Sequence, residues 1–158
     1  MKSPDPKVTE SLQTSCQILS HLAGQYQVDI QQMKALGIKW LAKRVKSWYK
    51  GTESQLRIFL QTLLYFGVDP EYDAGSVAGA DSVTEVLERA GSLAYAAMDF
   101  MCASRKQAWD IQADYTPDVY EHCIEELAHQ IKHIERELHL ISLSGETDYI
   151  LSRLGDGE

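Results

Sequence analysis

The sequence predicts an all-α protein of four long helices followed by a short helical tail. Apolar residues recur at steps of three and four along most of the chain, which is the period of amphipathic helices. No stretch alternates apolar and polar residues as a half-buried strand would. Only 4 of the 158 residues are Pro and 44% are hydrophobic, so the chain can bury a substantial core. We expect residues 1–158 to form a single domain.

The first two helices are expected on either side of Gly37. A first apolar stripe covers residues 8–33, with Asp29 as its polar exception. Gly37 is the natural end of this helix, because glycine readily adopts the left-handed conformation found at helix ends. A second stripe covers residues 41–66. Gly51 lies inside it and lowers the helix propensity, which indicates a local irregularity and leaves the register of the second helix open there.

A long connection separates the second helix from the third. Residues 67–80 contain Gly, Asp and Pro and show no strong period. Asp81 or Ser82 is then expected to cap the third helix, with Glu85 placed to complete a capping box against Ser82. Small residues along the stripe of the third helix predict a close approach to a neighbouring helix.

The fourth helix is expected to begin at residues 116–118, where Pro occupies a favoured first-turn position, and to end at Gly145. Residues 147–154 are expected to add a short helix. The predicted layout is therefore two helical hairpins joined by one long crossover.

Charge and composition argue against several classes of function. The net charge of −8 argues against a nucleic-acid partner, because phosphate binding requires a basic surface. Charged residues interrupt the longest apolar stretches, so no membrane span is expected. The first residues lack the apolar core of a signal peptide. Three widely spaced cysteines form no Cys-x-x-Cys metal site and suit a reducing compartment, so we expect a cytoplasmic protein.

A family resemblance extends along the whole chain in order, spacing and length. The residues that carry it are Met1-Lys2, Lys7-Val8, Leu12, Gln25-Tyr26, residues 37–41, residues 67–70, Asp114-Tyr115, residues 135–141, Gly145 and Asp148-Tyr149. On these residues the chain resembles bacterioferritin. The resemblance implies a ferritin-like four-helix bundle with a long crossover between the second and third helices and a short C-terminal helix. It also implies a 24-mer shell that stores ferric mineral, with haem between paired subunits.

The ligands of the family's di-iron centre are absent from the matching positions. These positions hold Leu19, Thr52, Gln55, Ala94, Leu127 and Gln130. A di-iron centre needs several carboxylates and imidazoles converging inward, so no catalytic residue is predicted. The resemblance implies a shell subunit without its own ferroxidase centre, which is structural or co-assembles with an active paralogue.

Three residues near these positions carry further expectations. Gln55 and Gln130 are expected to hydrogen-bond to each other in place of the metal bridge, with a water or small-ligand pocket as the alternative. Tyr26 matches a family tyrosine beside the iron site and is expected to pack there with its hydroxyl hydrogen-bonded. The haem-ligating Met of the family aligns near Glu53, and a carboxylate is a poor axial ligand, so haem is not expected in the usual manner.

The last long helix also carries a Glu-x-x-His pair, Glu126 and His129. Each lies two residues beyond a residue of the apolar seam, about 200° around the helix, so the pair is predicted to face away from the core. A one-residue shift of the helix would turn the pair inward as metal ligands. That shift would break the match at residues 135–141 and expose Leu127 and Ile131.

An alternative metal site uses the same outer face. His122, Glu126, His129 and His133 step by four, three and four. Two imidazoles four residues apart, such as His129 and His133, can chelate a divalent transition ion. A solvated face or a subunit contact is the competing interpretation. Besides the iron-storage subunit, the sequence thus leaves open a relocated metal site and a non-iron interaction or scaffold protein.

Overall fold

The computed structural model describes residues 4–73, 75–113 and 115–154. Over these residues it contains five helices and no strand: α1 (Pro6–Ala35), α2 (Lys39–Tyr65), α3 (Val83–Asp110), α4 (Thr116–Ser144) and α5 (Glu146–Arg153). The prediction of an all-α protein is confirmed.

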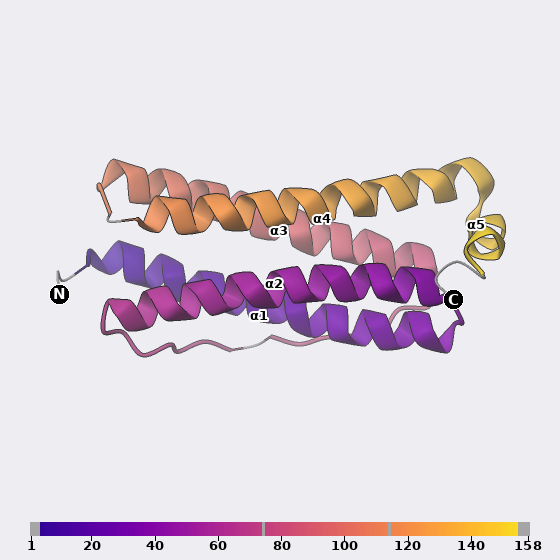
Figure 1. Ribbon diagram of the computed structural model, residues 1–158, viewed down its shortest axis with the longest axis horizontal. Helices are drawn as coiled ribbons and strands as arrows, with labels where there is room; N and C mark the ends of the chain where they lie inside the picture. The colour runs from indigo at the N-terminus through magenta and orange to yellow at the C-terminus, as the bar shows by residue number, and fades with distance from the viewer. Residues whose placement is uncertain (1–3, 74, 114, 155–158) are drawn as a thin grey trace.

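The four long helices lie lengthwise beside one another (Figure 1). α1 and α2 form one antiparallel hairpin, and α3 and α4 form a second, with α1 packed on α3 and α2 on α4. The crossover between α2 and α3 runs along the first hairpin and returns the chain to the end where α2 begins. α5 lies across that same end. None of the helices in the described ranges has an apolar stretch long enough to span a lipid bilayer.

The helix ends follow the signals in the sequence. Ser82 is the N-cap of α3, and its hydroxyl accepts from the backbone N–H of Glu85 at 3.1 Å. The Glu85 carboxylate accepts from the backbone N–H of Asp81 at 3.0 Å. The second bond of the capping box is therefore made to the residue before the N-cap and not to Ser82 itself. Gly37 and Gly145 follow α1 and α4 with φ values of 79° and 82°, which a residue with a Cβ adopts at a cost.

Glutamine side chains of α1 fasten the crossover to the hairpin. Gln13, Gln25 and Gln32 each bind the crossover backbone with both atoms of the amide. In one such contact, Gln25 Nε2 donates to the carbonyl of Ala78 at 2.8 Å and Gln25 Oε1 accepts from its N–H at 3.1 Å. The described residues of the crossover form no helix or strand that would satisfy their backbone, so these amides replace that pairing.

The polar exception in the first stripe, Asp29, forms a buried ion pair. Its side chain has 0% exposure and its Oδ1 lies 2.9 Å from a guanidinium nitrogen of Arg89 on α3. Gln25 donates to the same oxygen, and Arg89 also donates to the crossover carbonyl of Gly79. Burial raises the pKa of Asp29, while Gln25 and Arg89 oppose that shift. The pair therefore joins α1, α3 and the crossover.

Replacing Arg89 with alanine should lower the free energy of unfolding by about 3 kcal/mol, because it leaves a buried carboxylate without its charged partner. Urea denaturation at neutral pH measures this change. Arg105→Ala is the matched control, since Arg105 pairs with Glu121 on the surface and exposed pairs contribute below about 1 kcal/mol. Adding Asp29→Asn to the Arg89 variant should recover part of the loss. Equal losses in the Arg89 and Arg105 variants would contradict the assignment.

Candidate functional site

Most of the positions that match the family's iron ligands lie in the core. Leu19, Ala94 and Gln130 have 0% exposure, and Thr52 and Leu127 have 1%. Gln55 is half-buried. Leu19, Thr52, Ala94 and Leu127 lie on the apolar stripes drawn from the sequence and are buried, as those stripes predict. Gln130 flanks a stripe and is also buried, whereas Gln55, which was placed on a stripe, is only half-buried.

Gln130 is the centre of a hydrogen-bond network that joins three helices. Its Oε1 accepts from Tyr26 Oη of α1 at 2.8 Å. Its Nε2 donates to Thr52 Oγ1 of α2 at 3.0 Å and to Glu126 Oε1 of α4 at 3.0 Å, and lies 3.3 Å from the backbone oxygen of Trp48. We call these five residues the Gln130 network. Both ends of the buried amide are satisfied, as burial requires.

Tyr26 fixes the orientation of the amide. Burial, followed by the nearby carboxyl groups of Asp29 and Glu126, raises the pKa of Tyr26 far above its ordinary value. The hydroxyl therefore keeps its proton and donates. Its acceptor must be the oxygen of Gln130, which turns the amide nitrogen toward α2 and Glu126. The expectation that the Tyr26 hydroxyl is hydrogen-bonded is confirmed.

The expected bond between Gln55 and Gln130 is not formed. Gln55 Oε1 is buried and accepts no hydrogen bond from the described residues. Thr52, one turn earlier on α2, and Tyr26 occupy the amide of Gln130 instead. Gln55 lines a hollow on the surface between α2 and α4, beside Ile58 and His122.

Glu126 does not face away from the protein as its position relative to the apolar seam predicted. Its side chain is half-buried, and its carboxylate lies against Gly51 of α2. A Cβ at position 51 would lie 1.8 Å from Glu126 Oε1, so the glycine leaves the space that the carboxylate occupies. The irregularity expected at Gly51 is also absent, because α2 continues through it. His129 is exposed, as predicted.

The four residues of the alternative metal site are not brought together. His122 is exposed, and Glu126 is bonded to Gln130. His129 and His133 lie edge to face with ring centroids 4.5 Å apart, so two imidazoles remain adjacent. Within the described ranges, no group of three or more His, Cys, Asp or Glu side chains is placed to hold a metal ion.

The donor set at the centre does not fit a di-iron site. The hydroxyl of Thr52 and the amide of Gln130 are the polar groups at the buried matching positions, and both are engaged in hydrogen bonds. Neither supplies the anionic oxygens that iron requires. At the position expected for haem, Glu53 accepts from Tyr49 Oη at 2.5 Å and lies 3.6 Å from Arg57. These neighbours engage the carboxylate along α2, and the residues do not fit an iron or a haem site.

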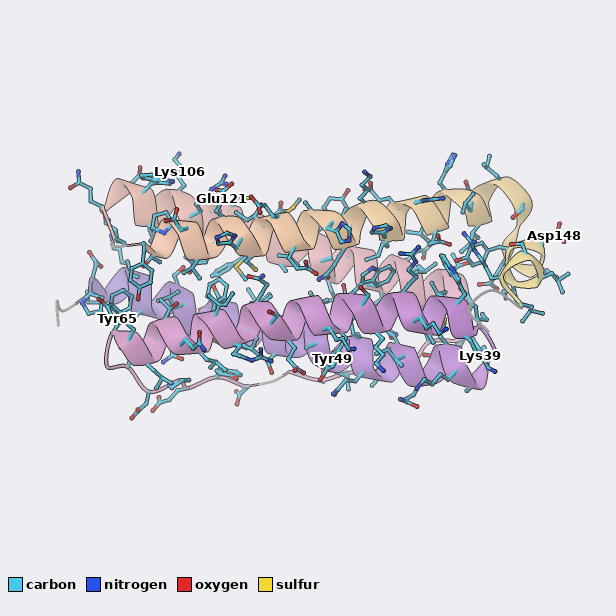
Figure 2. The ribbon with its side chains drawn as sticks, in the orientation of Figure 1. Lys39, Tyr49, Tyr65, Lys106, Glu121 and Asp148 are labelled. Atoms are coloured by element: carbon cyan, nitrogen blue, oxygen red, sulfur yellow. The ribbon has the colours of Figure 1, made fainter. Side chains whose placement is uncertain are left out.

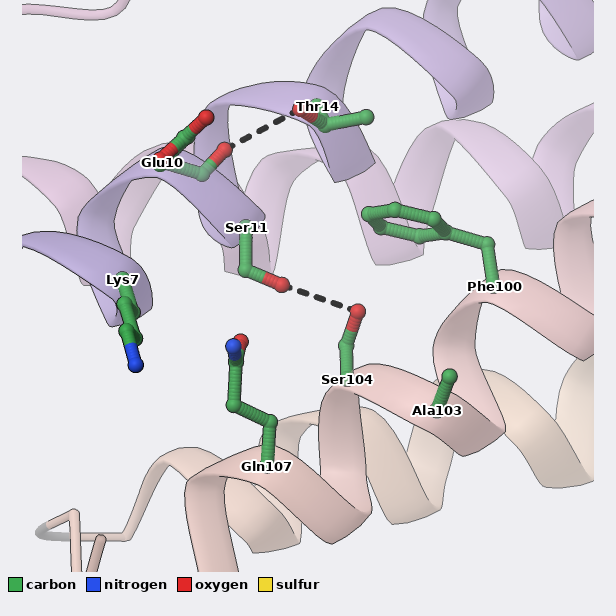
Figure 3. Close-up of a pocket in the computed structure, with 8 residues that line it drawn as sticks. All are labelled: Lys7, Glu10, Ser11, Thr14, Phe100, Ala103, Ser104 and Gln107. Atoms are coloured by element: carbon green, nitrogen blue, oxygen red, sulfur yellow. Dashed lines mark hydrogen bonds between the residues drawn. The ribbon is translucent and has the colours of Figure 1, made fainter.

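A separate hollow lies between α1 and α3 near the start of α1 (Figure 3). Ser11 Oγ donates to Ser104 Oγ across it at 2.8 Å, and Tyr120 Oη donates to Ser11 Oγ at 3.1 Å. These hydroxyls satisfy one another. The hollow therefore marks a polar contact between helices rather than a set of reactive groups.

Replacing Gly51 with alanine tests the contact with Glu126. An alanine inside a helix ordinarily adds about 1 kcal/mol relative to glycine. At position 51 the new methyl group must displace the Glu126 carboxylate from Gln130, which should cost about 1 kcal/mol or more. Chemical denaturation should therefore show little or no gain in stability.

Gly24→Ala is the matched control, because a Cβ there would lie at an ordinary 3.4 Å from Val77. It should show the usual gain. In a Glu126→Ala background the Gly51 substitution should also become stabilising. The same gain at position 51 with and without Glu126 would show that the carboxylate does not occupy this space.

Comparison with protein-family models and with curated proteins finds no match for this chain. The resemblance to bacterioferritin therefore rests on the residues quoted above. The chemistry of the site follows from its own side chains: a hydrogen-bond network around the buried amide of Gln130, which joins three helices and contains the half-buried carboxylate of Glu126 but no set of metal ligands.

Proposed function

We propose that this chain is a bacterioferritin-like subunit that supplies scaffold, and not ferroxidase chemistry, to an iron-storing shell. The observation that carries the proposal is the Gln130 network, which occupies the level where the resemblance implies a di-iron centre. Hydrogen bonds from one amide join α1, α2 and α4 there. A bridging metal would join helices in a similar way, so the network can replace its structural role without its redox role.

The layout of the helices supports the same proposal. Two hairpins, a crossover that runs lengthwise and a short helix across one end are the features of a ferritin-like bundle. The net charge of −8 would supply acidic side chains to the inner surface of a shell, where they can nucleate ferric mineral. In this proposal iron is cargo, and oxidation comes from a co-assembled paralogue.

Exposed apolar side chains at both ends of the molecule support self-association. At the end where α2 finishes, Tyr65 is 53% exposed and packs edge to face with Tyr115, with ring centroids 5.3 Å apart. At the α5 end, Leu143 and Leu151 are 71% and 62% exposed. Figure 2 labels Tyr65 at the first end and Asp148 at the second. In the proposed shell, contacts between subunits would cover these apolar side chains.

Aerobic addition of ferrous iron tests the missing ferroxidase centre. Oxidation is followed as the growth of ferric absorbance. The purified protein should show no rapid phase whose amplitude is proportional to the subunit concentration. A ferroxidase-competent bacterioferritin serves as the positive control. A fast phase of fixed iron-to-subunit stoichiometry would overturn the proposal, and its loss in a His129→Ala/His133→Ala variant would identify the relocated metal site instead.

Measuring particle mass tests the shell. Sedimentation of the protein, alone and mixed with a bacterioferritin, should show a large closed assembly in at least one condition. A stable monomer or dimer in both conditions would instead favour the rival class, a non-iron interaction or scaffold protein on the same helices.

A further inference from the structure

A small recess lies where the beginning of α2, the end of α4 and α5 meet. Its volume is about 50 Å³, room for a few water molecules or one compact ion. The residues that line it, which we call the arginine recess, are Trp40, Arg44, Trp48, His133, Arg136, Glu137 and Arg153. It lies at the end marked by Lys39 and Asp148 in Figure 2.

The charge of the arginine recess is positive although the chain is acidic. Its one carboxylate, Glu137, is buried, accepts from Tyr149 Oη at 2.5 Å and lies 3.2 Å from Arg153. Arg44 and Arg136 have no carboxylate within 4.0 Å among the residues that the structure describes. Within the described ranges, these two guanidinium groups therefore have no anionic partner.

Neighbouring groups increase the positive potential and hold the cations in place. The Arg44 guanidinium lies 5.0 Å from the centre of the Trp40 ring, and that of Arg153 lies 4.0 Å from it. Stacking of this kind orients a guanidinium before any ligand arrives. The pKa of His133 is lowered, first by burial and then by His129, Arg44, Arg136 and Lys132, which reflects the surrounding positive charge.

We propose that the arginine recess binds one compact oxyanion, a phosphate group, through the guanidinium groups of Arg44 and Arg136. The planar, forked donors of arginine match the oxygens of such an anion and can bind two at a time. The small volume favours a free ion over a phosphate that carries a large substituent. This binding is independent of the proposed role in iron storage.

Titration calorimetry with inorganic phosphate, at low and constant ionic strength, tests the proposal. We expect saturable binding of one ion per chain and a thermal shift that grows with phosphate concentration. Arg44→Gln and Arg136→Gln should each weaken binding at least tenfold. Both side chains are exposed, so neither change should unfold the protein, and circular dichroism verifies this.

Lys46→Gln is the matched control, because it removes the same charge from the neighbouring surface of α2 but lies outside the recess. It should change the affinity by less than about twofold, as expected for a screened surface charge. A nucleoside 5′-monophosphate forms a second arm: weaker binding than phosphate supports a free ion, and tighter binding identifies a phosphate ester as the ligand. Failure to saturate at about 10 mM phosphate, or an equal loss in Lys46→Gln and Arg136→Gln, would overturn the proposal.

Discussion

A buried amide must satisfy both its oxygen and its nitrogen, and Gln130 does so with groups from three helices. The protonated hydroxyl of Tyr26 fixes which end of the amide faces α1. That orientation in turn directs the nitrogen toward Thr52 and Glu126, and Gly51 provides the room for the Glu126 carboxylate. At this level of the core, the packing of α2 against α4 therefore includes the polar contacts of Gln130. An active metal centre would need the same space and the opposite chemistry, with anionic ligands in place of a neutral amide.

Amide chemistry also holds the outside of the molecule together. The crossover has no secondary structure of its own in the described ranges, yet Gln13, Gln25 and Gln32 each bind its backbone with both amide atoms. The buried pair of Asp29 and Arg89 fastens the same segment to α1 and α3. A long connection normally carries a high conformational entropy, and these contacts oppose it at several points along its length.

The periodicity of the sequence predicted the helices, their end signals at Gly37 and Gly145, and the inward positions of Leu19, Ala94 and Leu127. It did not predict where Glu126 points. A helical pattern gives the direction of a side chain relative to the apolar stripe of its own helix. It does not show which neighbouring helix packs beside that stripe. The only sequence signal was Gly51, a glycine inside a helix, read from propensity as an irregularity. The structure gives a different reason for the glycine: a side chain at position 51 would collide with the Glu126 carboxylate. That reason can be recognised only when α2 and α4 are known to be neighbours.

The net charge of the chain also conceals a local concentration of positive charge. The value of −8 is an average over the chain, whereas Lys39, Lys43, Arg44, Lys46 and Lys50 all lie on the first half of α2. An ion responds to the potential where it binds, so an acidic protein can still hold an anion at a basic recess. Trp48 links this end of α2 to the centre of the molecule. Trp48 lines the arginine recess, and its backbone oxygen accepts from Gln130. An ion that tightened the contact of α2 with α4 at the recess would thus also stabilise the Gln130 network, because both depend on the spacing of the same two helices.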